Sequence, residues 1–115
     1  MAANGVHGAI LVGVRHPVAP RKAAWSRELA CFTAELHCDG KLSRRGGGAL
    51  VLDSPLLALR HLAELTAHDA NSPPLCAGEI ISTGTLTLAM PVAKGQTWTT
   101  KVSGIPIEEI TVRFV

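Results

Sequence analysis

The sequence predicts an α+β fold that is mainly β, with mixed strand pairing. Three observations indicate it: one amphipathic helical pattern at about residues 54–69, several short runs typical of strands, and glycine or proline between them. The length of 115 residues is that of one ordinary domain, so residues 1–115 are expected to form a single domain. A content of 47% apolar and 17% charged residues favours a packed chain over a disordered one.

The first third of the chain is expected to contain strands. Residues 8–14 read GAILVGV, a continuous apolar run typical of a strand buried on both faces. Residues 17–22 hold two prolines and are expected to form a connection. From Thr33 onward the residues alternate as in a half-buried strand. The pair Asp39-Gly40 then favours a type I′ turn, after which residues 41–45 return as the partner strand.

Three successive glycines occupy residues 46–48. The run is either a flexible loop or a bend against which another backbone or a ligand packs closely, because glycine has no side chain. Its spacing matches neither of the usual phosphate-binding loops, so the sequence does not indicate nucleotide binding.

The clearest local element is the helix that begins at Ser54 and Pro55. Ser54 can cap the first free N–H groups, and Pro55 takes the first helical position, which needs no donor. Two prolines at residues 73–74 prevent the helix from continuing. The apolar stripe of this helix consists of Leu52, Leu56, Leu59, Leu62, Ala63 and Thr66.

The remainder is expected to form three strands, over residues 79–87, 96–102 and 107–115. Turn residues separate them, namely Pro91, Lys94-Gly95 and Ser103-Gly104. The last strand would place Ile110, Val112 and Phe114 on one face.

Composition disfavours several classes of protein. A net charge of +2 and an aromatic content of 3% are poorly suited to nucleic-acid binding, so no nucleic-acid partner is expected. No apolar run has the length of about 18 residues that a membrane span requires, so no membrane partner is expected. Three cysteines, an odd number, and the absence of a signal-peptide pattern favour a cytoplasmic location.

One segment could bind a ligand. Residues 78–87 place Ser82, Thr83, Thr85 and Thr87 around Gly84. Such hydroxyls can hold a carboxylate or carbonyl oxygen, and glycine lets the backbone come close to it. A threonine-rich strand with a bulge explains the same pattern, so both interpretations stay open on these residues alone.

Several blocks in order resemble one enzyme group. GGGALVLDSPLLALRHLAEL, PLCAGEIISTGTLTLAMPVAKGQTWTT, SGI and TVRF are similar to the closing blocks of the 2-keto-4-pentenoate hydratase and 4-oxalocrotonate decarboxylase group, within the fumarylacetoacetate hydrolase superfamily. The resemblance implies the C-terminal half of such an enzyme, with the mixed β-roll of that superfamily. It also implies a hydro-lyase that adds water to a short 2-keto-4-enoic acid, with decarboxylation as the related reaction.

The resemblance further implies a divalent Mg²⁺ or Mn²⁺ cofactor for the full-length family, which suits oxygen ligands and enolate chemistry. It carries substrate-binding roles to Ser54, Thr83, Gly84 and Thr85, and it assigns no catalytic residue. The segment AANGVHGAILVG is similar to a family strand whose aspartate falls here on Ala3. The family's metal-binding carboxylates and a lysine near the substrate lie upstream, so this chain is expected to lack the metal ligands.

Local residues offer weak alternatives for a metal site or a nucleophile. His61, Glu64 and His68 have helical spacing, and residues 37–39 form a His-Cys-Asp cluster, but both are typical of solvated surfaces. The cysteines have no adjacent base in the sequence, which disfavours a cysteine nucleophile.

Three hypotheses remain at the level of sequence. The chain could be the substrate-contacting half of a lyase, with little or no activity alone. It could instead be a binding or assembly module that covers its apolar surface as a homo-oligomer. A separate N-terminal half could also complement it.

Overall fold

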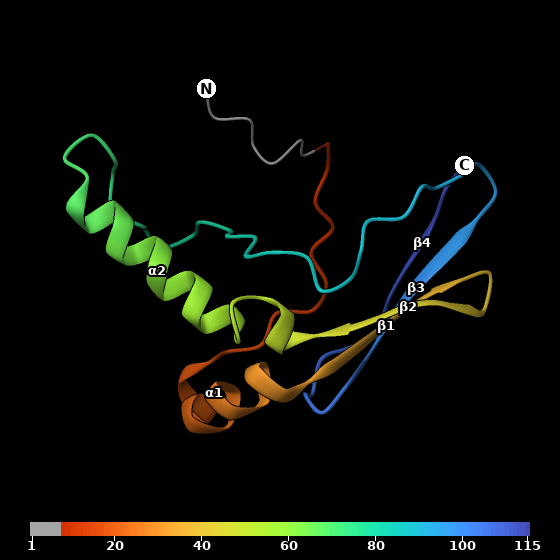
Figure 1. Ribbon diagram of the computed structural model, residues 1–115, viewed down its shortest axis with the longest axis horizontal. Helices are drawn as coiled ribbons and strands as arrows, with labels where there is room; N and C mark the ends of the chain where they lie inside the picture. Colours follow the sequence, from red (N-terminus) through yellow and green to blue (C-terminus); the bar gives the residue numbers. More distant parts are fainter. Residues whose placement is uncertain (1–7) are drawn as a thin grey trace.

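The computed structural model describes residues 8–115 and places a four-stranded sheet beside two helices (Figure 1). Helix α1 lies at one end of the sheet, α2 projects away from it, and residues 69–96 run back from α2 to the sheet. The elements are η2 (Ala19–Arg21), α1 (Lys22–Cys31), β1 (Thr33–Cys38), β2 (Lys41–Gly47), η3 (Gly48–Leu50), α2 (Pro55–His68), β3 (Thr97–Ser103) and β4 (Ile110–Arg113).

The strand order is β2-β1-β3-β4, and each neighbouring pair of described strands is antiparallel. The α+β class is therefore confirmed, whereas the expected mixed pairing is wrong for the described residues. A two-residue turn between β1 and β2 requires opposite strand directions, because parallel strands need a long crossover. The two helices, of 10 and 14 residues, also make the fold less dominated by strands than expected.

The β1–β2 hairpin confirms the sequence prediction. Asp39 and Gly40 have φ values of 48° and 80°, and a type I′ turn needs positive φ at both central positions. The turn is also tied to β3: the Asp39 backbone N–H donates to the Thr97 carbonyl at 2.8 Å, and the Thr97 N–H donates to Asp39 Oδ1 at 2.8 Å. Asp39 therefore fixes both the turn and the end of the neighbouring strand.

The sheet has one apolar and one polar face, as alternation along a half-buried antiparallel sheet requires. Cross-strand pairs such as Ala34 with Val102, and Trp98 with Val112, place apolar side chains on the same face. Ile110, Val112 and Phe114 line a groove on that face, which confirms their predicted common orientation. The polar face carries Glu35, His37, Arg45, Thr99, Lys101 and Thr111.

Helix α1 was not expected from the sequence. Trp25 and Phe32 belong to the small buried core, together with Ala34 of β1 and Ile105, and Leu29 packs against it. Residues 25, 29 and 32 have the three- and four-residue spacing of a helix, which is the signal that would have found it. The neighbouring alternation of β1 obscures that spacing.

Two predicted strands are absent from the described structure. Residues 8–14 are extended but form no strand, and their large side chains are exposed. Residues 79–87 also contain no strand. Apolar or β-branched composition favours a strand only where a partner backbone is available, and neither segment finds one among residues 8–115.

The glycine run packs against other backbone, as one of its two interpretations predicted. A Cβ atom on Gly46 would overlap the carbonyl oxygen of Leu86 and lie 2.6 Å from its carbonyl carbon. A Cβ on Gly48 would overlap the carbonyl oxygen of Leu29 and lie 2.6 Å from Cε1 of Phe32. The run therefore brings β2, α1 and the 83–87 segment together, and it is not a loose loop.

Helix α2 confirms its predicted bounds and cap, but none of its residues is buried. Leu57 and Leu65 are 40% and 70% exposed. The helix therefore presents apolar surface that the rest of the described chain does not cover. Among the described residues, no helix is both long and apolar enough to cross a bilayer.

Replacing Gly46 with alanine is expected to lower the free energy of unfolding by about 2 kcal/mol or more, because the new methyl group meets backbone atoms that cannot rotate away. Urea unfolding followed by circular dichroism would measure the loss. Gly8→Ala is the matched control, since a Cβ there has no atom within 4 Å. Equal stability of both variants would contradict the close packing of Gly46.

Candidate functional site

The candidate segment around Gly84 lies against the turn that precedes α2. A Cβ on Gly84 would be 3.3 Å from Cγ1 of Val51, which is buried. Val51 stands three residues before Ser54 and leads into the helix start. The structure therefore brings the Thr83–Gly84–Thr85 segment and the Ser54 turn to the same region, although they are far apart in the sequence.

The hydroxyl groups of this segment are partly engaged in local hydrogen bonds. Thr85 Oγ1 donates to the carbonyl oxygen of Thr87, and Thr87 Oγ1 donates to the carbonyl of Leu88 at 3.3 Å. Thr83 is half-buried, whereas Gly84 and Thr85 are exposed. A ligand oxygen could reach Thr85 by replacing the carbonyl of Thr87 as the hydrogen-bond acceptor.

Thr85 also lines a groove between the apolar face of the sheet and residues 85–92. The groove has a volume of about 260 Å³. Most of its side chains are apolar, so it suits the hydrocarbon part of a small ligand better than a charged group. The lining residues are Leu36, Thr85, Thr87, Leu88, Ala89, Met90, Val92, Trp98, Thr100, Ile110, Val112 and Phe114.

Ser54 has a structural role at the start of α2. It is 6% exposed, and its Oγ accepts a hydrogen bond from the Leu56 backbone N–H at 3.3 Å. Its backbone is extended, as expected at a helix N-cap. The oxygen that the resemblance assigns to substrate is therefore engaged in capping the helix, and the substrate role stays a prediction.

The polar face of the sheet holds a cluster that sequence reasoning did not identify. Glu35 Oε2 lies 2.9 Å from Nε2 of His37, and Glu35 Oε1 accepts a hydrogen bond from Nε of Arg45 at 2.9 Å. The hydrogen bonds with His37 and then with Arg45 hold the pKa of the Glu35 carboxyl below its ordinary value. Residues two apart on a strand share a face, and that period is the signal in the sequence that could have paired Glu35 with His37.

The grouping of His37 with Cys38 and Asp39 does not form a common site. Cys38 lies on the opposite face of β1 from His37, since successive strand residues alternate. Burial raises the pKa of the Cys38 thiol, with the Asp39 charge as a further cause. A raised thiol pKa is contrary to what a nucleophilic cysteine needs.

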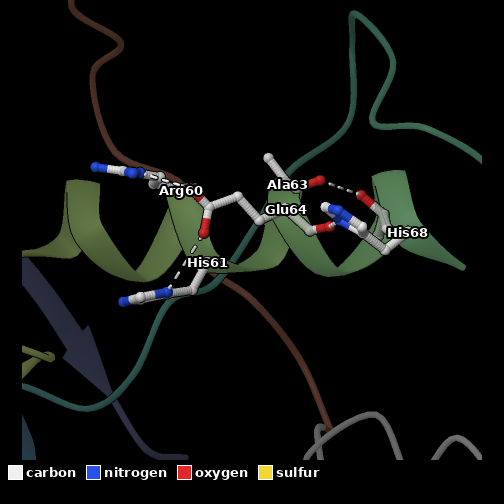
Figure 2. Close-up of polar contacts among 6 residues, drawn as sticks. Arg60, His61, Ala63, Glu64 and His68 are labelled. Atoms are coloured by element: carbon white, nitrogen blue, oxygen red, sulfur yellow. Dashed lines mark hydrogen bonds and ion pairs between the residues drawn. The ribbon is translucent and has the colours of Figure 1, made fainter.

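Glu64 of α2 is occupied by neighbours on its own helix (Figure 2). Its Oε1 accepts from Nε of Arg60 at 2.7 Å, whereas Nδ1 of His61 lies 3.8 Å from Oε2. Nδ1 of His68 lies 2.6 Å from the backbone carbonyl oxygen of Glu64 and not from its carboxylate. Arg60 holds the pKa of the Glu64 carboxyl below its usual range. The arrangement is that of an exposed ion pair.

Across residues 8–115, no three His, Cys, Asp or Glu side chains gather closely enough to hold a metal ion. A hard divalent cation is held by several oxygen ligands, among them carboxylates. The described residues therefore do not fit a magnesium or calcium site.

Comparisons with known proteins agree with the resemblance in the sequence. No family model matches the chain. The chain is 35% identical over 88 residues to 4-oxalocrotonate decarboxylase of Pseudomonas sp. (strain CF600). The aligned region covers 76% of this chain and 32% of that enzyme. The chain thus spans about a third of the length of this relative.

Solved structures give the same result. 4-Oxalocrotonate decarboxylase from Pseudomonas putida G7, complexed with calcium and acetate, superposes with a TM-score of 0.66 at 33% identity, over 76% of this chain and 32% of that one. Its complex with magnesium and adipate gives the same values. The expected resemblance is therefore confirmed, as is the binding of a divalent metal by full-length relatives.

Replacing Ser54 with alanine is expected to lower the free energy of unfolding by about 1 kcal/mol, because the partly buried Leu56 N–H loses its acceptor. Chemical denaturation would measure the change. Ser26→Ala is the control, since Ser26 is an exposed residue inside α1. If the two substitutions proved equally mild, the capping role of Ser54 would be wrong.

The Glu35 cluster predicts a dependence of stability on pH. A lowered carboxyl pKa stabilises the folded chain above the ordinary pKa of 4.5, and this contribution is lost as the pH falls through the lower folded value. The wild type should therefore lose its advantage over Glu35→Gln as the pH drops below 4.5. Urea titrations at a series of pH values would show it, with Glu109→Gln as the control for an exposed carboxyl. An advantage independent of pH would contradict the prediction.

Proposed function

Because this chain is similar to about a third of 4-oxalocrotonate decarboxylase, we propose that it is the substrate-contacting part of a metal-dependent lyase that acts on a short 2-keto acid. The agreement of sequence and fold, each over 76% of the chain, carries the proposal. The proposed activity belongs to the assembled enzyme, because the described residues do not fit the metal.

The geometry of the Gly84 region supports a role in binding substrate. Thr83 and Thr85 flank a glycine whose backbone is open to solvent on one side and packs on Val51 on the other. Thr85 stands at the edge of the apolar groove. We propose that the hydroxyl groups bind carboxylate or enolate oxygens while the groove accepts the carbon chain. Donors fixed beside a developing oxyanion stabilise it because they need no reorganisation during the reaction.

Two reactions are candidates for this lyase. The resemblance in the sequence implies hydration of a 2-keto-4-enoic acid. The relatives named above are decarboxylases, which favours loss of carbon dioxide from a related 2-keto acid. Both reactions pass through an enol or dienol in the family, so the same hydroxyl groups could serve either.

The chain's incomplete match to its relatives also bears on partners. We propose that carboxylates from a further polypeptide segment complete the site, and that the completed protein has the β-roll of the superfamily.

Three free cysteines among the described residues are in keeping with a cytoplasmic enzyme. The alternative is a non-catalytic module that covers the exposed apolar side chains of α2 by self-association.

The proposal can be tested by complementation. The chain would be combined with a polypeptide that contains the part of the Pseudomonas putida G7 decarboxylase outside the matched region, with Mg²⁺ and either 4-oxalocrotonate or a 2-keto-4-enoic acid. Release of carbon dioxide and loss of the enoic acid would be measured separately. Turnover that requires both polypeptides supports the proposal and decides between the two reactions.

Thr85→Val should lower kcat/KM of the assembled enzyme by about 10- to 100-fold, because it removes one donor to a charged oxygen while keeping the shape of the side chain. Thr66→Val makes the same chemical change on α2, where the hydroxyl donates only to Ala63, and should leave kcat/KM unchanged. No turnover in any combination, or equal effects of the two substitutions, would refute the proposed role.

A further inference from the structure

Residues 8–14 form an extended segment whose apolar side chains lack cover. Ile10 and Val12 are 51% and 48% exposed, and Leu11, which points to the other side of an extended chain, is 62% exposed. Val14 is 67% exposed. Both sides of the segment are therefore open, although its sequence is that of a strand buried on both faces.

The segment is nevertheless fixed in place at its C-terminal end. A Cβ on Gly13 would be 3.0 Å from Cδ1 of Ile110, so the segment passes directly beside the start of β4. Nε2 of His16 lies 2.8 Å from Oε2 of Glu108, and the carbonyl of Pro17 accepts from Nε1 of Trp25 at 3.3 Å. These contacts hold residues 13–17 next to the sheet (Figure 1).

The backbone of the segment has no sheet partner in the described structure. Between residues 8 and 14, no backbone N–H or carbonyl forms a hydrogen bond with the backbone of another residue in the 8–115 range. An extended apolar segment with free donors and acceptors is a template for pairing with another strand. Pairing would satisfy those groups and cover the side chains at the same time.

We propose that residues 8–14 are a docking strand, which pairs edge to edge with a strand of the polypeptide that supplies the unmatched two thirds of the decarboxylase-like fold. Such strand addition obtains its affinity from main-chain hydrogen bonds and its specificity from alternate side chains. This inference rests on the proposed function, because the occupant, the partner that pairs with residues 8–14, is identified from the part of the relatives that the chain does not match.

The relatives favour this occupant over a second copy of the chain. The matched region superposes on a polypeptide of which it covers only 32%, so most of that fold is contributed by other residues. Exposed apolar side chains also occur on α2 and on residues 75–92, well outside the docking strand. A second copy paired through residues 8–14 alone would leave those side chains open.

Hydrogen–deuterium exchange tests the docking strand directly. The 115-residue chain would be measured alone and with the unmatched part of the Pseudomonas putida G7 decarboxylase, in the presence of Mg²⁺. Exchange of amides 9–14 should slow by about 10-fold or more on mixing, because each paired N–H is then protected. No binding, or binding with unchanged exchange at residues 9–14, would overturn the inference.

A matched pair of substitutions tests the contact itself. Val12→Asp places a charge in the proposed interface and should weaken binding by about 10-fold or more, measured by titration calorimetry. Val115→Asp makes the same change at a side chain that is 94% exposed and should bind like the wild type. Circular dichroism would verify that both variants keep the fold. Equal affinities of the two variants would overturn the docking strand.

The outcomes separate this inference from the proposed function. Protection of residues 9–14 without turnover would support the docking strand and refute the lyase. Turnover without protection of residues 9–14 would support the lyase and overturn the docking strand. Protection that rises with concentration in the chain alone would show pairing between two copies and overturn the proposed occupant.

Discussion

Close backbone packing at residues 46–48 is the constraint on which the rest of the structure depends. Gly46 meets the carbonyl group of Leu86, and Gly48 meets the carbonyl of Leu29 and the ring of Phe32. Both approaches are possible only because these positions have no Cβ. They join the end of β2 to helix α1 on one side and to the candidate segment on the other. Leu86 consequently lies beside the small core, and the preceding Gly84 reaches Val51, so the position of the candidate site follows from the glycine run.

The parts of the fold that could be predicted are those determined by residues adjacent in the sequence. Asp39 and Gly40 supply the positive φ of their turn, and Ser54 and Pro55 begin α2 through their own chemistry. The parts that could not be predicted depend on distant partners. Residues 8–14 and 79–87 have strand composition but meet no partner strand among residues 8–115, so they are extended segments. Helix α1 has only two large apolar residues, Trp25 and Leu29, and its place is fixed by Trp25 and by the ring of Phe32 after its end, which meet only in the folded core.

The candidate site, too, could be predicted only in part from the sequence. The hydroxyl-rich sequence around Gly84 indicated a binding segment, but only the fold places it against the turn before Ser54 and at the edge of an apolar groove. The two-residue spacing could have paired Glu35 with His37 from the sequence, but the third member, Arg45, joins them only through the register of the hairpin. The same reasoning explains why spacing on α2 gave no metal site. The Glu64 carboxylate lies 2.7 Å from Nε of Arg60 and 3.8 Å from Nδ1 of His61, so Arg60 is already its partner. Residue spacing identifies candidates, and the partners that each group finds decide its chemistry.

The bonds between Asp39 and Thr97 have a consequence for the order of folding. They join residues 58 positions apart, whereas the β1–β2 hairpin closes across two residues. Loop closure over such a distance carries an entropic cost before any contact compensates for it, and long-range strand pairing is correspondingly slow. The hairpin and α2 can therefore form early, while β3 must wait for residues 69–96 to cross the sheet. During that interval the apolar face of the hairpin is open to water, which makes the step before β3 docks the one at which this chain is most exposed to aggregation.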